Sequence, residues 1–214
     1  MDLPFLNKRS KKSDHVVAID LGSRSTKAVY LQRRGDSFDV RSYTIVDAPG
    51  VGDRPPSAEL LAEHLKQVHQ TLGAPTKQII IAVGVQETLL RHAEMPLLPM
   101  PDLRNMLKYG SKNYLQEELA GHVFDCHLLS FQQPPPAAGD AAKAKVNPAT
   151  LKQRVLVGGI KQERLSVLIE AAKSAGLFLD AVVPGHIGPA NAMEVAENES
   201  FTKEVVALVE VRSW

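Results

Sequence analysis

The stretch that decides the fold is residues 20–27, which read Asp20-Leu21-Gly22-Ser23-Arg24-Ser25-Thr26-Lys27. Short apolar runs flank it at 16–19 and 28–31, and their β-branched and aromatic residues are typical of strands. The stretch is therefore predicted to be the turn of a β-hairpin. A P-loop is excluded, because that motif places Gly-Lys-Ser/Thr at the start of a helix, and here neither the residue order nor the following element fits.

The chemistry of this turn suits a phosphate group. Backbone N–H groups and hydroxyls can cradle phosphate oxygens, a lysine adds a positive charge, and a carboxylate can hold a hydrated divalent cation. We expect Arg24 to be solvated, as loop arginines usually are. The predicted phosphate-binding residues are Asp20, Gly22, Ser23, Ser25, Thr26 and Lys27, and Asp20 is also the predicted metal residue.

The residues that follow predict an α/β domain. A third antiparallel strand is expected at 39–46 from its loose alternation of apolar and polar residues. Ser57 then suits the N-cap of a helix that Gly73 ends, and residues 77–83 form an apolar run typical of a buried parallel strand. Three antiparallel strands, a crossover helix and a returning strand are the opening of a ribonuclease-H-like domain.

An insertion is predicted to begin after Gly84. It consists of a strand at 87–95, a proline-rich turn, a helix that starts near Pro101 and carries one apolar stripe as far as Leu119, and strands at 123–131 and 154–160. Between the last two strands, residues 132–150 contain three prolines followed by an Ala/Gly/Lys tract, a composition that predicts a mobile loop.

The remaining residues predict two helices and two strands. The first helix spans 162–175, with Leu165, Leu168, Ile169 and Ala172 facing inward. A strand at 178–183 and a helix at 186–197, interrupted near Pro189, follow it. The last predicted element is a strongly apolar strand at 205–211.

Several segments resemble one protein family. "AIDLGSRSTKAVYLQ" resembles the first phosphate-binding hairpin of the actin, Hsp70 and sugar-kinase superfamily, and more closely that of the type IV pilus assembly ATPase PilM. "RHAEMPLLPMPDLRNMLKYGSKNYLQEEL" is similar to the start of the family's inserted subdomain, which the cell-division protein FtsA shares. "LVGGIKQERLSVLIEAAKSAGLFLDAVVPGHIGPANAM" is similar to the family's strand, helix, turn and returning helix.

The resemblance implies an α/β fold, an actin-like (ribonuclease-H-like) N-terminal lobe with an FtsA/PilM-type inserted subdomain. The predicted division is a basic flexible tail at 1–14, the first part of the ribonuclease-H-like subdomain at 15–84 and the inserted α+β subdomain at 85–183. A returning helix follows at 184–204, and residues 205–214 would be the first strand of a second lobe.

The resemblance also implies a function. Members bind ATP or ADP with Mg²⁺, and they hold the cytoplasmic tail of a PilN-type bitopic inner-membrane protein at the cytoplasmic face of that membrane. The tail-binding groove is expected near Met95, Met100 and Leu103. Because the family's second lobe is not in this sequence, we expect weak nucleotide binding, no ATP hydrolysis by this chain alone and self-association through 205–211.

Composition narrows the classes of function. The 214-residue chain has a net charge of +1, so no nucleic-acid partner is expected. Cys126 is the only cysteine, which predicts a reducing compartment. No apolar run approaches the roughly 18 residues of a membrane-spanning helix, and the basic tail reverses the order of a signal peptide. These features predict a cytoplasmic protein.

No catalytic residue is assigned from the sequence. His64 and His69 lie five apart on a predicted helix, whereas paired ligands on one face lie three or four apart. Cys126 is expected to pack with Phe124 and Leu128 as a buried hydrophobe. Two alternatives remain open: a small-molecule kinase of the same superfamily, and a nucleotide-free adaptor resembling the type II secretion protein GspL.

Overall fold

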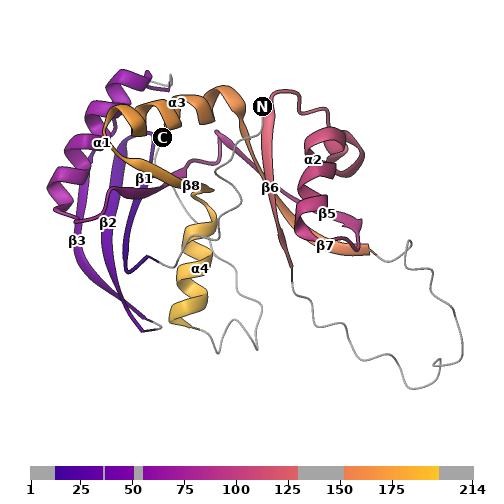
Figure 1. The fold of residues 1–214 in the computed structure, drawn as a ribbon, viewed down its shortest axis with the longest axis horizontal. Helices are drawn as coiled ribbons and strands as arrows, with labels where there is room; N and C mark the ends of the chain where they lie inside the picture. Colours follow the sequence, from indigo (N-terminus) through magenta and orange to yellow (C-terminus); the bar gives the residue numbers. More distant parts are fainter. Residues whose placement is uncertain (1–12, 36, 51–54, 130–151, 198–214) are drawn as a thin grey trace, which may run out of the picture. The chain divides into compact units, whose positions relative to one another are not determined.

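A computed structural model describes residues 13–35, 37–50, 55–129 and 152–197 (Figure 1). Most of the predicted basic tail, the predicted loop at 132–150 and the predicted strand at 205–211 lie outside these residues. The described chain forms two units: unit 1 contains the residues up to Gly84 and those from Ser166 onward, and unit 2 contains those of Val85–Leu165.

Unit 1 is built on a five-stranded sheet with the strand order β3-β2-β1-β4-β8. The neighbours β1–β2 and β2–β3 are antiparallel, and β4 runs parallel to both β1 and β8. The predicted three-stranded meander and parallel returning strand are therefore confirmed. The strands are β1 (His15–Leu21), β2 (Ser25–Arg34), β3 (Ser37–Asp47), β4 (Gln78–Val83) and β8 (Phe178–Pro184).

Helix α1 (Ala58–Leu72) packs against β2 and β3 (Figure 1). Its N-terminus is capped by the Ser57 hydroxyl, which accepts from the Leu60 N–H, and Gly73 ends it with φ of 62°. A left-handed residue of this kind suits glycine, so both predicted caps are confirmed. The buried residues of α1 are Leu61, Ala62, Leu65, Val68 and Leu72, whereas Leu60 is 42% exposed.

The structure places the end of the insertion earlier than residue 183. Strand β8 pairs with β4 in the sheet of unit 1, so the residues from Ser166 onward belong to that unit. Such a pairing joins residues about a hundred positions apart and has no local signature in the sequence. Helix α3 (Gln162–Ser174) crosses this boundary, and helix α4 (Ile187–Ala196) follows β8.

Two details of these helices differ from the prediction. Ile169 of α3 is 45% exposed, and Ala171 is buried with Leu168 and Ala172 instead. Helix α4 runs through Pro189 without interruption. Pro189 lies in the first turn, where a backbone N–H has no intrahelical partner to lose.

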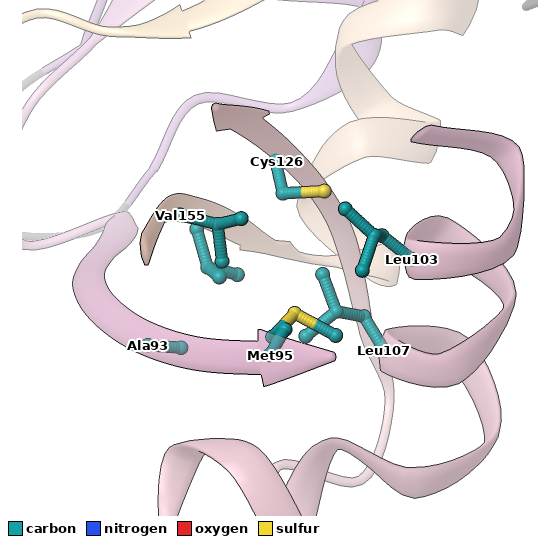
Figure 2. Packing of buried hydrophobic residues seen from close by; sticks show 7 residues of the cluster. Ala93, Met95, Leu103, Leu107, Cys126 and Val155 are labelled. Atoms are coloured by element: carbon teal, nitrogen blue, oxygen red, sulfur yellow. The ribbon is translucent and has the colours of Figure 1, made fainter. Parts of the chain in front are cut away.

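The described residues of unit 2 form a three-stranded antiparallel sheet, helix α2 and the first residues of α3. The strand order is β5-β7-β6, which places the last strand in sequence at the centre. Figure 2 shows Cys126 and Met95 directing their sulfur atoms toward the leucines of α2, in a core that also contains Val155. The elements are β5 (Thr88–Pro96), α2 (Met100–Leu115), β6 (His122–Leu128) and β7 (Lys152–Lys161).

Helix α2 is shorter than its apolar stripe predicts. It ends at Leu115, Gln116 takes a left-handed conformation with φ of 57°, and Leu119 lies outside the helix. Gly110 is non-helical within it, with φ of −143°, so the helix is kinked there. The predicted start is confirmed, because Pro101 lies in the first turn after Pro99 at the N-cap.

Candidate functional site

The turn between β1 and β2 is a tight hairpin, as the sequence predicts. Asp20 pairs with Lys27 across the two strands, so the acid and the lysine lie side by side at its base. A Cβ atom added at Gly22 would lie 2.6 Å from the Ser25 carbonyl oxygen, so only glycine fits this turn. The Ala48 N–H also donates to the Arg24 carbonyl at 2.9 Å, which ties the loop to the end of β3. Residues 20–27 are called the phosphate hairpin below.

The side chains of the phosphate hairpin divide between the two faces of the sheet. Lys27 and Asp20 line a shallow apolar pocket of about 370 Å³ on one face, together with Val29 and Ile45. Thr26 is fully buried on the other face, where its Oγ1 lies 2.8 Å from His64 Nε2 of α1. The Thr26 hydroxyl is thus buried and bonded inside the unit, and its predicted phosphate contact stays a prediction.

The remaining predicted residues are placed where a ligand can reach them. Ser23 is exposed, and Gly22, Ser25 and Asp20 are half-buried. Arg24 is exposed, as expected for a loop arginine, and takes part in other interactions of the described structure. The hairpin thus presents backbone and hydroxyl groups at its tip and opposite charges at its base.

The phosphate hairpin lies at the carboxyl edge of three parallel strands. β1, β4 and β8 all end there, since Leu21 pairs with Val83, and Val83 pairs with Pro184. The Gly185 N–H donates to the Val83 carbonyl at 2.8 Å, and a Cβ atom at Gly185 would lie 3.4 Å from Asp20 Oδ1. Ligands of open α/β sheets bind outside this edge.

The sequence analysis assigned no role to Gly185 or His186. His186 precedes α4, makes no side-chain capping bond, and its Nδ1 is buried without a hydrogen-bond partner among the described residues. A buried polar atom without a partner points to an absent ligand or water. The available signal was the Pro-Gly pair directly after the strand predicted at 178–183, which places a turn at the edge where the phosphate hairpin also lies.

These residues fit a phosphate group with a hydrated divalent cation. Gly22 is required by the turn itself, and Asp20 lies beside Gly185, where an added Cβ atom would be 3.4 Å from Asp20 Oδ1. Lys27 supplies a positive charge next to that carboxylate. The orphaned His186 Nδ1 can donate to a phosphate oxygen or accept from a water molecule, and the backbone N–H groups at the N-terminal end of α4 can donate to a phosphate oxygen.

Two of the three predicted partner-binding residues are core residues. Met95 and Leu103 are both fully buried in the core of unit 2, and only Met100 is half-buried. The turn between β5 and α2 is held by Gln153, whose Nε2 donates to the carbonyls of Pro96 and Leu98 at 2.9 Å each. Leu97 is 57% exposed and Leu98 38% exposed on this turn.

Cys126 and His69 both lie in surroundings typical of residues that stabilise the fold. Burial, and then the charge of Asp125, raises the pKa of the Cys126 thiol, while Arg104 opposes this more weakly. Cys126 packs with Phe124 as predicted, but Leu128 is 38% exposed and outside that core. His69 bonds to the Thr76 carbonyl at 2.7 Å, separately from His64.

Neither a metal cluster nor a membrane helix occurs in the part of the chain that the structure describes. Within it, no group of three or more His, Cys, Asp or Glu side chains could hold a metal ion. No helix there is long and apolar enough to cross a membrane.

Comparison with known proteins identifies the fold. No protein-family model and no curated protein sequence matches the chain. Its structure is similar to the PilM-PilN type IV pilus biogenesis complex, with a TM-score of 0.68 and 15% identity over 86% of this chain and 52% of the matched chain. It therefore spans about half the length of that structure.

Two further structures are more distant. One is the cytoplasmic domain of EpsL, an inner-membrane component of the type II secretion system of Vibrio cholerae, at a TM-score of 0.46 and 15% identity over 79% of this chain and 57% of that one. The other is a Bacteroides thetaiotaomicron protein with an actin-like ATPase fold. Its TM-score is 0.37, and it is 12% identical over 94% of this chain and 60% of the matched chain. The likeness to the PilM-PilN complex confirms the fold predicted from the sequence, an α/β lobe of the PilM type with an inserted unit.

Proposed function

We propose that this chain is the phosphate-binding part of a PilM-like, actin-fold nucleotide-binding protein that acts in assembly of a type IV pilus or a related secretion apparatus. The observation that carries the proposal is the place of the phosphate hairpin. In a fold shared with a pilus biogenesis complex, Asp20, Gly22 and Lys27 lie at the carboxyl edge of the parallel strands. None of the comparisons favours the small-molecule kinase.

The ligand of this edge is proposed to be ATP or ADP with Mg²⁺. Backbone N–H groups at the tip of the hairpin hold phosphate oxygens, Lys27 contributes charge, and Asp20 holds the cation through water. Bound Mg²⁺ would neutralise part of the phosphate charge. Ser23 and Ser25 remain possible hydroxyl donors, whereas Thr26 has a structural role.

The proposed contacts all come from one edge of a single sheet, so binding by this chain alone is expected to be weak. We expect a dissociation constant of about 1 mM or weaker, which corresponds to a binding free energy of only about 4 kcal/mol. We propose that ATP hydrolysis is not catalysed by this chain alone.

The proposed partner is the cytoplasmic tail of a PilN-type inner-membrane protein, which would place the chain at the cytoplasmic face of that membrane. In unit 2 the turn at 96–100 is a suitable contact, because Gln153 fixes its backbone and leucines stand out from it. A fixed backbone with exposed apolar side chains loses little entropy on binding. Met95 and Leu103 would support this turn from the core. Self-association through residues 205–211 is a further part of the proposal, to be measured by light scattering.

The test is co-purification with the tail of a bitopic membrane protein encoded beside this chain. We expect the tagged tail to retain the chain, and Mg·ADP at millimolar concentration to change the amount retained. A matched control uses the same tail with its residue order scrambled. Equal retention by both tails, with no effect of Mg·ADP, would contradict the proposed function.

A further inference from the structure

The strongest unassigned feature is the hydrogen bond between helix α1 and the phosphate hairpin. Thr26 is the only polar residue found fully buried among the described residues, and its Oγ1 lies 2.8 Å from His64 Nε2. Thr26 pairs with Leu21 on one side and with Val46 on the other, so strands cover both of its flanks. A buried hydroxyl that loses its partner is costly, so this contact constrains β2 strongly.

The bond decides which face of the sheet each hairpin residue occupies. Successive residues of a strand point to opposite faces, so fixing Thr26 toward α1 directs Lys27 to the opposite face. Lys27 is indeed exposed there and pairs with Asp20. A shift of β2 by one residue would bury Lys27 and separate this charge pair from the carboxyl edge.

We propose that His64 is a positioning residue of the phosphate hairpin: it holds Thr26, and through it Lys27, in place, and protonation of its half-buried imidazole weakens this hold. The hydrogen bond between His64 and Thr26, called the lock below, depends on the structure of unit 1 alone. Its consequence for ligand binding rests on the function proposed above.

The surroundings of His64 favour the neutral ring. Burial lowers the pKa of His64 from its ordinary value of 6.5. A polar pocket of about 460 Å³ beside it is lined by Ser25 of β2, Asp47 of β3 and Gln67 of α1. Asp47 is the titratable group among these residues, and its carboxylate does not offset the effect of burial on His64.

Because burial lowers the pKa of His64, the folded hairpin is expected to lose stability as the pH falls. The unfolded or loosened state binds a proton at a higher pH than the locked state, so the stabilisation is complete above about pH 6.5. It is lost as the pH falls through the lowered pKa of His64. The hairpin should therefore loosen in mildly acidic solution.

The test is hydrogen exchange of the ligand-free 214-residue chain between pH 5 and 8, corrected for intrinsic rates and followed in a peptide covering residues 20–28. We expect the hairpin amides to lose on the order of tenfold protection below pH 6 in the wild type. His64→Gln, which keeps a hydrogen-bonding side chain but does not titrate, should retain protection across the range. Thr26→Val should lose protection at every pH.

Two controls separate His64 from other groups. His15 bonds to the Tyr30 hydroxyl at 2.8 Å, at the far end of the same two strands, so His15→Gln should leave the pH step unchanged. Asp47→Asn should also keep the step. The proposal is overturned if the step persists in His64→Gln, or if either control removes it.

A second measurement addresses ligand binding. With Mg·ADP as the probe, the wild type should lose more affinity than His64→Gln between pH 8 and pH 5, since the terminal phosphate of ADP titrates at about pH 6 for both proteins and only the difference between them reports on His64. If the exchange results hold and neither form binds Mg·ADP, the lock stands and the proposed nucleotide function fails. If both forms bind equally at pH 5 and 8, the positioning role is overturned.

Discussion

A few residues of the phosphate hairpin each have a different structural role. Asp20 and Lys27 are paired across β1 and β2, so the two charges partly compensate each other when no ligand is bound. Gly22 allows the turn, and Thr26 anchors it to α1. Each task predicts a different result when the residue is changed.

Removing the charges should affect ligand binding more than folding. Asp20→Ala should abolish the Mg²⁺ dependence of ADP binding, and Lys27→Ala should weaken binding about tenfold, since a charge-assisted contact contributes roughly 1.5–3 kcal/mol. Calorimetry with and without Mg²⁺ measures both effects. Arg24→Ala is the matched loop control. Unchanged affinity in both site variants would reduce the hairpin to a structural turn.

Adding one methyl group at Gly22 should destabilise unit 1. The new Cβ atom would lie 2.6 Å from a backbone oxygen, and backbone cannot move aside cheaply. We expect Gly22→Ala to cost about 1–3 kcal/mol of unfolding free energy, measured by urea denaturation. Gly188→Ala is the control, because a Cβ atom there meets no atom within 4 Å. Equal stability of the two variants would show that the turn relaxes freely.

At the scale of single elements, β6 holds Cys126 in a buried position. Cys126 faces the core of unit 2, and burial raises the pKa of its thiol. The thiolate is the reactive form, so a disulfide reagent at pH 8 should modify native Cys126 much more slowly than the unfolded chain. The native rate should still be rising above pH 8.5, the pKa of an ordinary thiol. Equal rates for native and unfolded protein would contradict this burial.

The turn between β5 and α2 makes a second prediction for an element. A glutamate at Leu97 should weaken retention by the membrane-protein tail at least several-fold, because it places charge on an exposed apolar contact. Gln153→Ala should weaken it by freeing the turn. Tyr109→Glu changes an exposed side chain of α2 outside this turn and serves as the control. Full retention by the Leu97 and Gln153 variants would place the contact elsewhere.

Most helices and strands were predicted from the sequence, because capping residues and apolar periodicity lie within the element that they specify. Ser57 and Gly73 bound α1 by capping, and alternation identified the strands. The end of α2 was mispredicted, since the apolar stripe continues past Leu115 while the backbone turns at Gln116. The membership of β8 in the sheet of unit 1 depends on pairing with β4, which no local window contains.

The candidate site was only half predictable for the same reason. The hairpin is contiguous, so its composition indicated Asp20, Gly22 and Lys27. The two-residue period of β2 could have placed Thr26 with buried Ala28 and Tyr30, but its bond to His64 joins elements 38 residues apart. Gly185 and His186 enter the site through the parallel sheet, and the sequence analysis treated them only as a turn and a helix start.

At the scale of the whole molecule, the described chain consists of two units with separate cores. Unit 1 brings together segments before and after unit 2, so its site needs residues from both ends of the described chain. Unit 2 has its own buried cluster beneath α2 (Figure 2). Nucleotide binding is proposed for the first unit, and peptide binding at an exposed turn is proposed for the second.

The most direct test of this account is an NMR titration of the isotope-labelled chain with Mg·ADP up to about 10 mM, which would occupy a millimolar site. The account predicts that amide shifts change at residues 20–27 and at Gly84, Gly185 and His186, and that Asp20→Ala removes these changes. The amides around Cys126 in the core of unit 2 should remain unchanged. Shifts confined to other parts of the chain, or an identical response from Asp20→Ala, would contradict the assignment of a nucleotide site to this edge.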